Sequence, residues 1–245
     1  MKKQRLDKFI ANQLNISRRD ARNAIHRGNA TVNGEVVKDE AYLLDIEADR
    51  VGYCGNSIGY KEFVYIVMNK PAGVLSASND KSRETVIDLV PDGMKRQGLF
   101  PVGRLDKDTT GLLIITDDGV FAHNCISPKK MIPKSYIAEL DGEINDGIIK
   151  CFKDGVTLSD GTVCKSAELE RISGNTVRII ITEGKYHQIK RMFGTQNLGV
   201  NKLHRESIGG LYLPDNLKTG ECIEISRQEL ENAVSFKQCS KSSHF

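Results

Sequence analysis

Residues 103–119 read GRLDKDTTGLLIITDDG and join a charged loop to a short apolar segment. The apolar run Leu112–Ile115 has the length and composition of a buried strand. Asp117-Asp118-Gly119 then indicates a turn and a helix N-cap. A carboxylate beside a rigid strand can be held in one geometry, so Asp106 is a candidate reactive group.

Two other interpretations of this segment stay open. Asp and Gly are common in loops, so a surface turn whose Asp and Arg only pair with each other also fits. Asp106, Asp108 and Thr110 match the Asp-x-Asp-x-Thr pattern of phosphatases that form an aspartyl-phosphate and depend on magnesium. Those enzymes place the nucleophile after a hydrophobic strand, whereas Pro101 and Gly103 interrupt the preceding segment here.

The charge of the chain is concentrated at its N-terminal end. The 245 residues are 39% hydrophobic, enough for a core, and carry a net charge of only +3. Residues 1–38 alone hold nine Lys or Arg and three Asp or Glu, a net charge of +6. This distribution predicts a nucleic-acid-binding appendage on a near-neutral body, with a solvated basic helix face as the alternative.

Cysteine spacing and hydropathy predict a cytoplasmic protein with reduced thiols. The chain has no Cys-x-x-Cys pair, no apolar segment typical of a signal peptide, and no run long enough to span a membrane. We therefore expect neither a disulfide nor a metal site at the six cysteines, which are Cys54, Cys125, Cys151, Cys164, Cys222 and Cys239.

The basic end predicts two helices and a hairpin. Apolar residues have helical spacing over residues 5–14, and Ser17 and Gly28 are typical of the start and end of a second helix. Asn33-Gly34 is a characteristic hairpin turn. The second helix would expose Arg18, Arg19 and Arg22.

The remainder mixes strands and helices without a regular βαβ alternation, which indicates the α+β class. We expect the end of the small domain and a linker within residues 39–60, and a loop with a short helix within residues 78–97. The resulting domains are residues 1–59, residues 60–236 and a disordered tail at residues 237–245. The predicted strands are 63–68, 112–115, 134–140 and 177–182, and the predicted helices are 120–125, 144–152, one opening at Gly184, and 228–233.

Three motifs in one order resemble the pseudouridine synthases, specifically the bacterial ribosomal small-subunit enzymes and their large-subunit relatives. They are Asn69-Lys70-Pro71-x-Gly73, the segment Gly-Arg-Leu-Asp-x-x-Thr-x-Gly-Leu-Leu that begins at Gly103, and residues 183–193, EGKYHQIKRMF. The two helices and hairpin before them resemble the alpha-L RNA-binding module.

The synthase resemblance implies a mainly antiparallel sheet with an active cleft and an isomerase that needs no cofactor and no metal. It implies that Asp106 is the nucleophile, that Tyr136 of a Lys-x-Tyr motif lies in the active site, and that Lys190 is the basic partner of Asp106. We expect Asp108 to be structural and His187 to fix a helix start. The remaining expected RNA contacts are Arg18, Arg19, Arg22, Lys70, Arg104 and Arg191.

The implied partner is 16S ribosomal RNA or its precursor particle. We expect a monomer that does not bind membranes. Two alternative functions remain: a large-subunit (23S) synthase, and a ribosome-assembly RNA-binding protein without catalysis.

Overall fold

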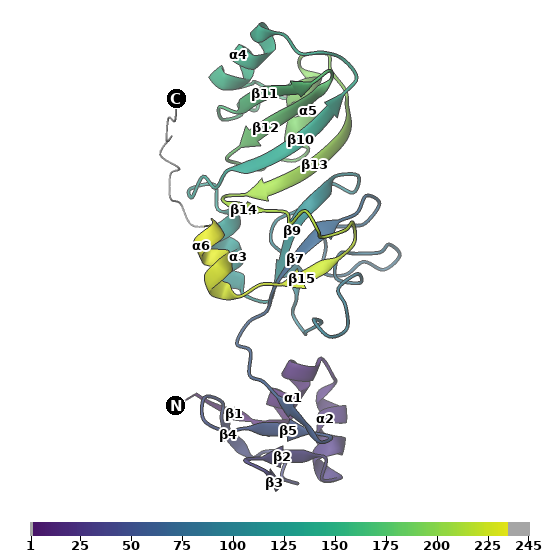
Figure 1. Cartoon of the computed structure of the whole chain (residues 1–245), viewed down its shortest axis with the longest axis vertical. Coiled ribbons are helices and arrows are strands. Elements are labelled where there is room, and N and C mark those ends of the chain that lie inside the picture. Colours follow the sequence, from purple (N-terminus) through teal and green to yellow (C-terminus); the bar gives the residue numbers. More distant parts are fainter. Residues whose placement is uncertain (1, 235–245) are drawn as a thin grey trace. The chain divides into compact units, whose positions relative to one another are not determined.

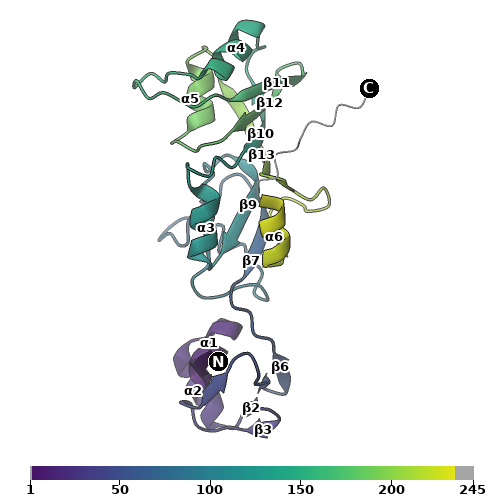
Figure 2. The same ribbon diagram turned by 90° about the vertical axis from the view of Figure 1, so that its left-hand side faces the viewer.

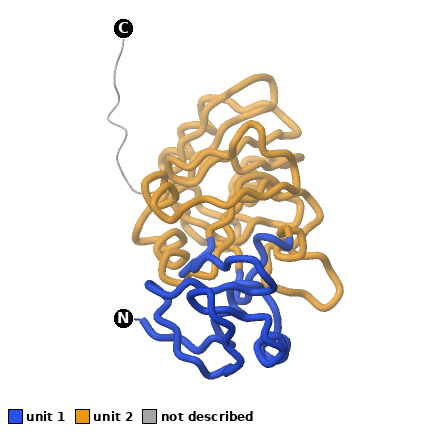
Figure 3. The backbone as a smooth tube through the Cα atoms, turned by 60° about the horizontal axis from the view of Figure 1, so that its bottom comes forward, with its two compact units in different colours: residues 1–64, 92–99 blue, residues 65–91, 100–245 orange. Residues whose placement is uncertain are grey.

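A computed structural model describes residues 2–234 of the chain (Figure 1). The described chain divides into two compact units, coloured separately in Figure 3. The first unit extends to Val64 and also contains Asp92–Leu99; the second contains Tyr65–Pro91 and the chain from Phe100 onward. The segment 92–99 joins the first unit because Arg96 donates hydrogen bonds to the carbonyl oxygens of Lys61 and Glu62, at 2.7 and 3.0 Å.

The first unit contains two helices and two small sheets. In one sheet β1 pairs with β4, and in the other the strand order is β3-β2-β5-β6. The predicted hairpin is confirmed, because Asn33 and Gly34 both have positive φ between β2 and β3. The elements are β1 (Lys3–Arg5), α1 (Leu6–Leu14), α2 (Arg18–His26), β2 (Ala30–Val32), β3 (Glu35–Val36), β4 (Leu43–Asp45), β5 (Val51–Tyr53) and β6 (Asn56–Ile58).

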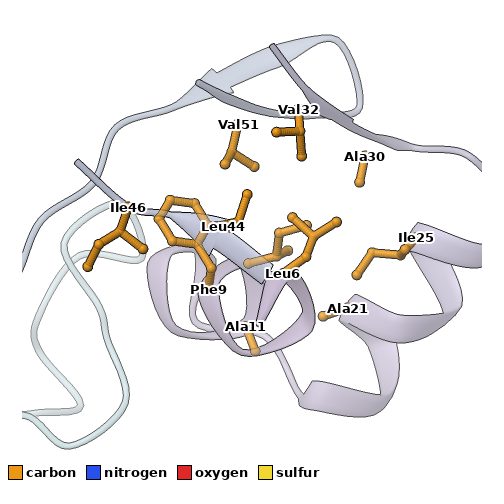
Figure 4. Packing of buried hydrophobic residues seen from close by; sticks show 11 residues of the cluster. Leu6, Phe9, Ala11, Ala21, Ile25, Ala30, Val32, Leu44, Ile46 and Val51 are labelled. Atoms are coloured by element: carbon orange, nitrogen blue, oxygen red, sulfur yellow. The ribbon is translucent and has the colours of Figure 1, made fainter. Parts of the chain in front are cut away.

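The core of the first unit forms between the helices and the strands. Figure 4 shows Leu6 and Phe9 of α1, Ile25 of α2, and Val32 and Val51 of the sheet directed toward one another. The apolar spacing of residues 5–14 produces this buried face. The hydroxyl of the residue before α2, Ser17, accepts a hydrogen bond from the backbone N–H of Asp20, so the predicted cap is confirmed.

The second unit is built on one mixed sheet (Figure 1). Its main strand order is β11-β12-β10-β13-β9-β7-β15, with β14 beside β13 and β8 beside β9. Every pairing is antiparallel except that of β13 with β9, which confirms the expected mainly antiparallel sheet and the α+β class. The strands are β7 (Tyr65–Lys70), β8 (Phe100–Pro101), β9 (Thr110–Thr116), β10 (Lys134–Leu140), β11 (Glu168–Ser173), β12 (Thr176–Ile181), β13 (Val200–Ile208), β14 (Leu211–Tyr212) and β15 (Cys222–Glu224).

Four helices accompany this sheet in the described chain. Helices α3 (Gly119–Ile126) and α6 (Arg227–Val234) lie beside β7 and β9, and α4 (Asp146–Asp154) and α5 (Gln188–Gly194) lie by the other half of the sheet (Figure 2). The side chain of Asp118 accepts hydrogen bonds from the first turn of α3, as the predicted N-cap requires. The rings of Phe152 and Phe193, 4.8 Å apart, join α4 to α5.

One expectation is narrowed, one is wrong, and one falls outside the described chain. Residues 39–60 hold the end of the small domain, but β4, β5 and β6 lie in this segment and complete the sheets of the first unit, so a linker can begin only after Ile58. No helix forms within residues 78–97, and β11 was not foreseen. The predicted disordered tail, residues 237–245, lies outside the described residues. None of the helices in residues 2–234 is long and apolar enough to cross a membrane.

Gly111 sets the distance between β9 and its parallel neighbour β13. Its φ is +99°, and a Cβ built there would lie 2.3 Å from the carbonyl oxygen of Arg205. Since backbone atoms cannot move aside as a flexible side chain can, no residue other than glycine fits without shifting the two strands.

Gly111→Ala is therefore expected to lower the free energy of unfolding by about 3 kcal/mol, from the positive φ and the backbone clash together. Urea denaturation followed by circular dichroism measures the loss. Gly119→Ala is the matched control, because nothing lies within 4 Å of its added Cβ and its φ needs no glycine. Equal stability of the two variants would contradict the close approach of β9 and β13.

Candidate active site

The loop that carries Asp106 is fixed by a buried ammonium group. Lys70, the last residue of β7, is 0% exposed, and its Nζ donates hydrogen bonds to the carbonyl oxygens of Pro71, Lys107 and Thr109 at 2.9, 3.2 and 2.9 Å. Burial lowers the pKa of Lys70 to about 8. The ammonium thus ties the end of β7 to both sides of the tight turn before β9.

A second clamp holds the loop immediately before Asp106. The hydroxyl of Ser76 donates to the carbonyl oxygen of Leu105 at 3.0 Å, and the N–H of Leu105 donates back to the hydroxyl at 3.1 Å. The backbone N–H of Thr109 donates to the carbonyl oxygen of Asp106 at 3.1 Å. Because backbone groups on each side of Asp106 are bonded, its Cα has little freedom.

The side chain of Asp106 lines a pocket within the second unit. Its side chain is 26% exposed and its Oδ1 lies 3.4 Å from Nε2 of His187, the residue before α5. Tyr136 of β10 lines the same pocket and is buried. The pocket is lined by Arg104, Leu105, Asp106, Thr109, Tyr136, Ile181, Gly184, Lys185, His187, Gln188, Ile189 and Leu203.

Lys190 does not lie against Asp106 as the resemblance implied. Its Nζ contacts both carboxylate oxygens of Asp108, at 2.6 and 2.5 Å. This hydrogen bond is the main reason that the pKa of Asp108 lies below its ordinary value. The side chain that lies next to the Asp106 carboxylate is instead that of His187, which we expected only to fix the start of a helix. Sequence spacing alone could not tell which of Asp106 and Asp108 pairs with Lys190, because the turn of the loop decides which carboxylate lies next to that lysine.

Arg205 is a site neighbour that the sequence did not reveal. It is buried on β13, where its Nε donates to the carbonyl oxygen of Leu112 at 2.8 Å. Its Nη1 donates to the hydroxyl oxygen of Tyr136 at 3.4 Å, and its guanidinium carbon lies 5.9 Å from the centre of the Tyr136 ring. A lone arginine in an alternating strand reads as solvent-facing, so only the sheet pairing identifies this contact.

The two predicted RNA contacts near the pocket differ in their partners. Arg104 is exposed and lines the pocket, and within residues 2–234 no hydrogen bond or ion pair engages its guanidinium. Arg191 of α5 is bound to Asp160, with Nη2 2.5 Å from a carboxylate oxygen. Arg104 is therefore available to a ligand as it stands, whereas Arg191 must leave Asp160 first.

Three arginines of the first unit lie around one buried carboxylate. Asp7 is 0% exposed and accepts hydrogen bonds from Arg5 and Arg18, at 3.1 and 2.9 Å, while Nε of Arg22 lies 3.8 Å away. Burial alone would raise the pKa of Asp7, but the hydrogen bonds from Arg5 and Arg18 outweigh it and keep that pKa below its ordinary value. Arg19 is exposed, and no ion pair engages it in the described chain.

The prediction that Lys70 contacts phosphate is corrected by its burial, since an ammonium without exposed surface cannot reach a phosphate. No group of three or more His, Cys, Asp or Glu side chains in residues 2–234 could hold a metal ion.

Lys70→Met is expected to lower the free energy of unfolding by about 2 kcal/mol, because carbonyl oxygens lose a buried donor. Lys107→Met changes an exposed lysine of the same loop and serves as the matched control. Urea denaturation of both variants checks the difference, and wild-type stability of Lys70→Met would refute the clamp.

Comparisons with known proteins agree with this architecture. A family model described as RNA pseudouridylate synthase matches residues 64–195, and the S4 domain model matches residues 4–51. The chain is 39% identical over 232 residues to "Ribosomal small subunit pseudouridine synthase A" of Escherichia coli K12, covering 94% of this chain and 100% of that protein. It is 40% identical over 230 residues to an uncharacterised RNA pseudouridine synthase of Bacillus subtilis, covering 92% and 96%.

A solved structure described as a pseudouridylate synthase has the same fold. It superposes with a TM-score of 0.65 at 33% identity and covers 94% of this chain and 99% of its own. The family model alone spans more than half of the chain, and the relatives span nearly all of it. The chain therefore belongs to the RNA pseudouridylate synthase family and is an RNA pseudouridine synthase whose S4 RNA-binding domain precedes the catalytic domain in the sequence.

Proposed function

We propose that the enzyme converts one uridine of 16S ribosomal RNA to pseudouridine, with Asp106 as the nucleophile and the target base flipped out of the RNA. The observation that supports this most is a single pocket lined by both the Asp106 carboxylate and the Tyr136 ring. A flipped base needs a flat partner and the reaction needs a nucleophile within reach of the ribose or the ring. The pocket supplies one of each on opposite elements, the loop before β9 and strand β10.

The reaction is an isomerisation in which atoms and electrons balance. The bond between uracil N1 and ribose C1′ breaks, a bond between C5 and C1′ forms, C5 loses a proton and N1 gains one. Asp106 acts as the nucleophile, and the ring of Tyr136 stacks on the uracil, with its hydroxyl positioned to move the C5 proton. Arg205 supports this role, since its Nη1 donates a hydrogen bond to the hydroxyl oxygen of Tyr136 at 3.4 Å.

The cations around the pocket have separate tasks in this proposal. Arg104 is exposed and unpaired in residues 2–234, which suits a side chain that contacts RNA at the flipped nucleotide or fills the space that the base leaves. Lys190 holds Asp108 and so ties α5 to the nucleophile loop. Extrusion costs a few kcal/mol, which stacking on Tyr136 and phosphate contacts offset.

Small-subunit RNA is the proposed substrate because a relative that shares 39% of its residues over nearly the whole length carries that name. A 23S synthase is the alternative within the same family. We propose that the enzyme works as a monomer in the cytoplasm, on 16S RNA or on a precursor particle.

Mapping pseudouridine after incubation with unmodified 16S RNA, its precursor particle and 23S RNA, without added metal, tests the substrate. We expect one modified uridine, in the small-subunit RNA. Modification of 23S RNA alone would overturn the 16S assignment. Tight RNA binding without any pseudouridine in either RNA would favour a ribosome-assembly role instead.

The arginines of the S4 domain give a second test. Arg19→Gln and Arg18→Gln each remove one proposed phosphate contact. The negative slope of log association constant against log salt concentration should therefore become shallower by about 0.7–0.9 in each variant. Only Arg18→Gln should also lower the melting temperature, because it takes a hydrogen-bond donor from buried Asp7. Salt titration and thermal melts measure both effects, and an unchanged slope in both variants would remove helix α2 as an RNA contact.

A further inference from the structure

The most exposed aromatic ring beside the pocket has no role in the mechanism above. Tyr186 is 76% exposed, although it lies next to His187, which lines the pocket. The rings of Tyr186 and His187 are stacked, with centroids 3.9 Å apart and planes 16° apart. One face of Tyr186 is therefore supported by His187, while most of its surface faces solvent.

His187 holds this stack in an uncommon backbone conformation. Its φ is 47° and its ψ is 35°, in the left-handed region that residues other than glycine rarely adopt. Such conformations cluster at functional sites, where the surrounding structure enforces them. Because the Nε2 of His187 lies 3.4 Å from Asp106, the same residue contacts the proposed nucleophile through its edge and Tyr186 through its face.

We propose that Tyr186, supported by His187, is a stacking platform for the base of a nucleotide that flanks the target uridine. The inference rests on the proposed function, because it places the flanking base beside a flipped uridine. When the target leaves the RNA stack, its neighbours lose a stacking partner and expose a π-face. A flat, rigid aromatic ring at the rim of the pocket replaces that partner.

Nucleobases fit this surface better than other ligands do. Aromatic rings that bind single-stranded RNA stack on bases irrespective of sequence, and cations beside them contact the backbone. Arg104 lines the pocket beside Tyr186 and is exposed, and within residues 2–234 no ion pair engages its guanidinium. Arg191 donates to the carbonyl oxygen of Tyr186 at 3.4 Å, but its charge is paired with Asp160. The platform thus has the two components that a single RNA strand requires, a stacking face and positive charge.

Tyr212 provides an internal comparison. It lies on β14 of the same unit and is 65% exposed. Unlike Tyr186, it has no chain neighbour that lines the pocket, and among residues 2–234 no aromatic ring stacks on it. Loss of this ring removes a similar area of exposed aromatic surface without touching the proposed platform.

The test uses single-turnover pseudouridine formation by the full chain on the small-subunit RNA. We expect Tyr186→Ala to raise the half-saturating enzyme concentration about tenfold, the usual effect of losing one stacked base. Tyr186→Phe should behave as wild type, because stacking needs the ring and not the hydroxyl. Tyr212→Ala is the matched control and should leave the half-saturating concentration unchanged.

Abasic substitution identifies the occupant. In an RNA fragment around the mapped uridine, an abasic nucleotide is placed on the 5′ side or on the 3′ side. One of the two should weaken binding to wild type about tenfold and have no further effect on Tyr186→Ala. Independent, multiplicative losses would overturn the proposal, as would an effect at neither position.

The outcomes separate this inference from the proposed function. If wild type forms no pseudouridine in the small-subunit RNA, the proposed function fails. If wild type is active and Tyr186→Ala saturates at the wild-type concentration, only the platform fails. Because Tyr186 is exposed and its carbonyl group remains in Tyr186→Ala, thermal melts of that variant should match wild type.

Discussion

The buried ammonium of Lys70 is the contact on which the active site depends. It binds the carbonyl oxygen of Pro71, beside it in the chain, and those of Lys107 and Thr109, which follow Asp106. It lies at the end of β7, the neighbour of β9. Carbonyl oxygens that converge on one cation cannot separate without leaving it uncompensated in the interior. The loop that carries the proposed nucleophile is therefore held in one geometry without RNA, which lowers the reorganisation that the proposed reaction needs.

The sheet then brings distant segments to that loop. Strand β13 lies between β9 and β10, so the end of the loop that carries Asp106 and Tyr136 are separated by one strand although they are about thirty residues apart in sequence. Gly111 permits the close parallel pairing of β9 with β13, and Arg205, opposite Gly111, reaches Tyr136 on the other side. His187, the residue before α5, and Gln188 and Ile189 of α5 line the same pocket. The fold thus brings a carboxylate, an aromatic ring and a histidine to one pocket.

Much of this could be predicted from local sequence, and the failures have physical causes. The apolar run at 112–115, the Asn33-Gly34 turn and the Asp118 cap depend on neighbouring residues, and each lies where it was expected. The burial of Lys70 and Arg205 depends on strand pairing, which no local pattern encodes, so a lysine predicted to contact phosphate became a clamp. Lys190 pairs with Asp108 and not with Asp106, which is two residues away. The path of the turn between them decides this, and local sequence does not encode that path.

The nucleophile is tested most directly by comparing Asp106→Asn with Asp108→Asn in single-turnover reactions, with RNA binding measured in parallel. Asp106→Asn should bind small-subunit RNA as wild type does and form no pseudouridine. Asp108→Asn should keep measurable turnover, because it loses an ion pair with Lys190 and no reacting group. Pseudouridine formation by Asp106→Asn at the wild-type rate would contradict the account, since no other carboxylate lines the pocket in the part of the chain that the structure describes.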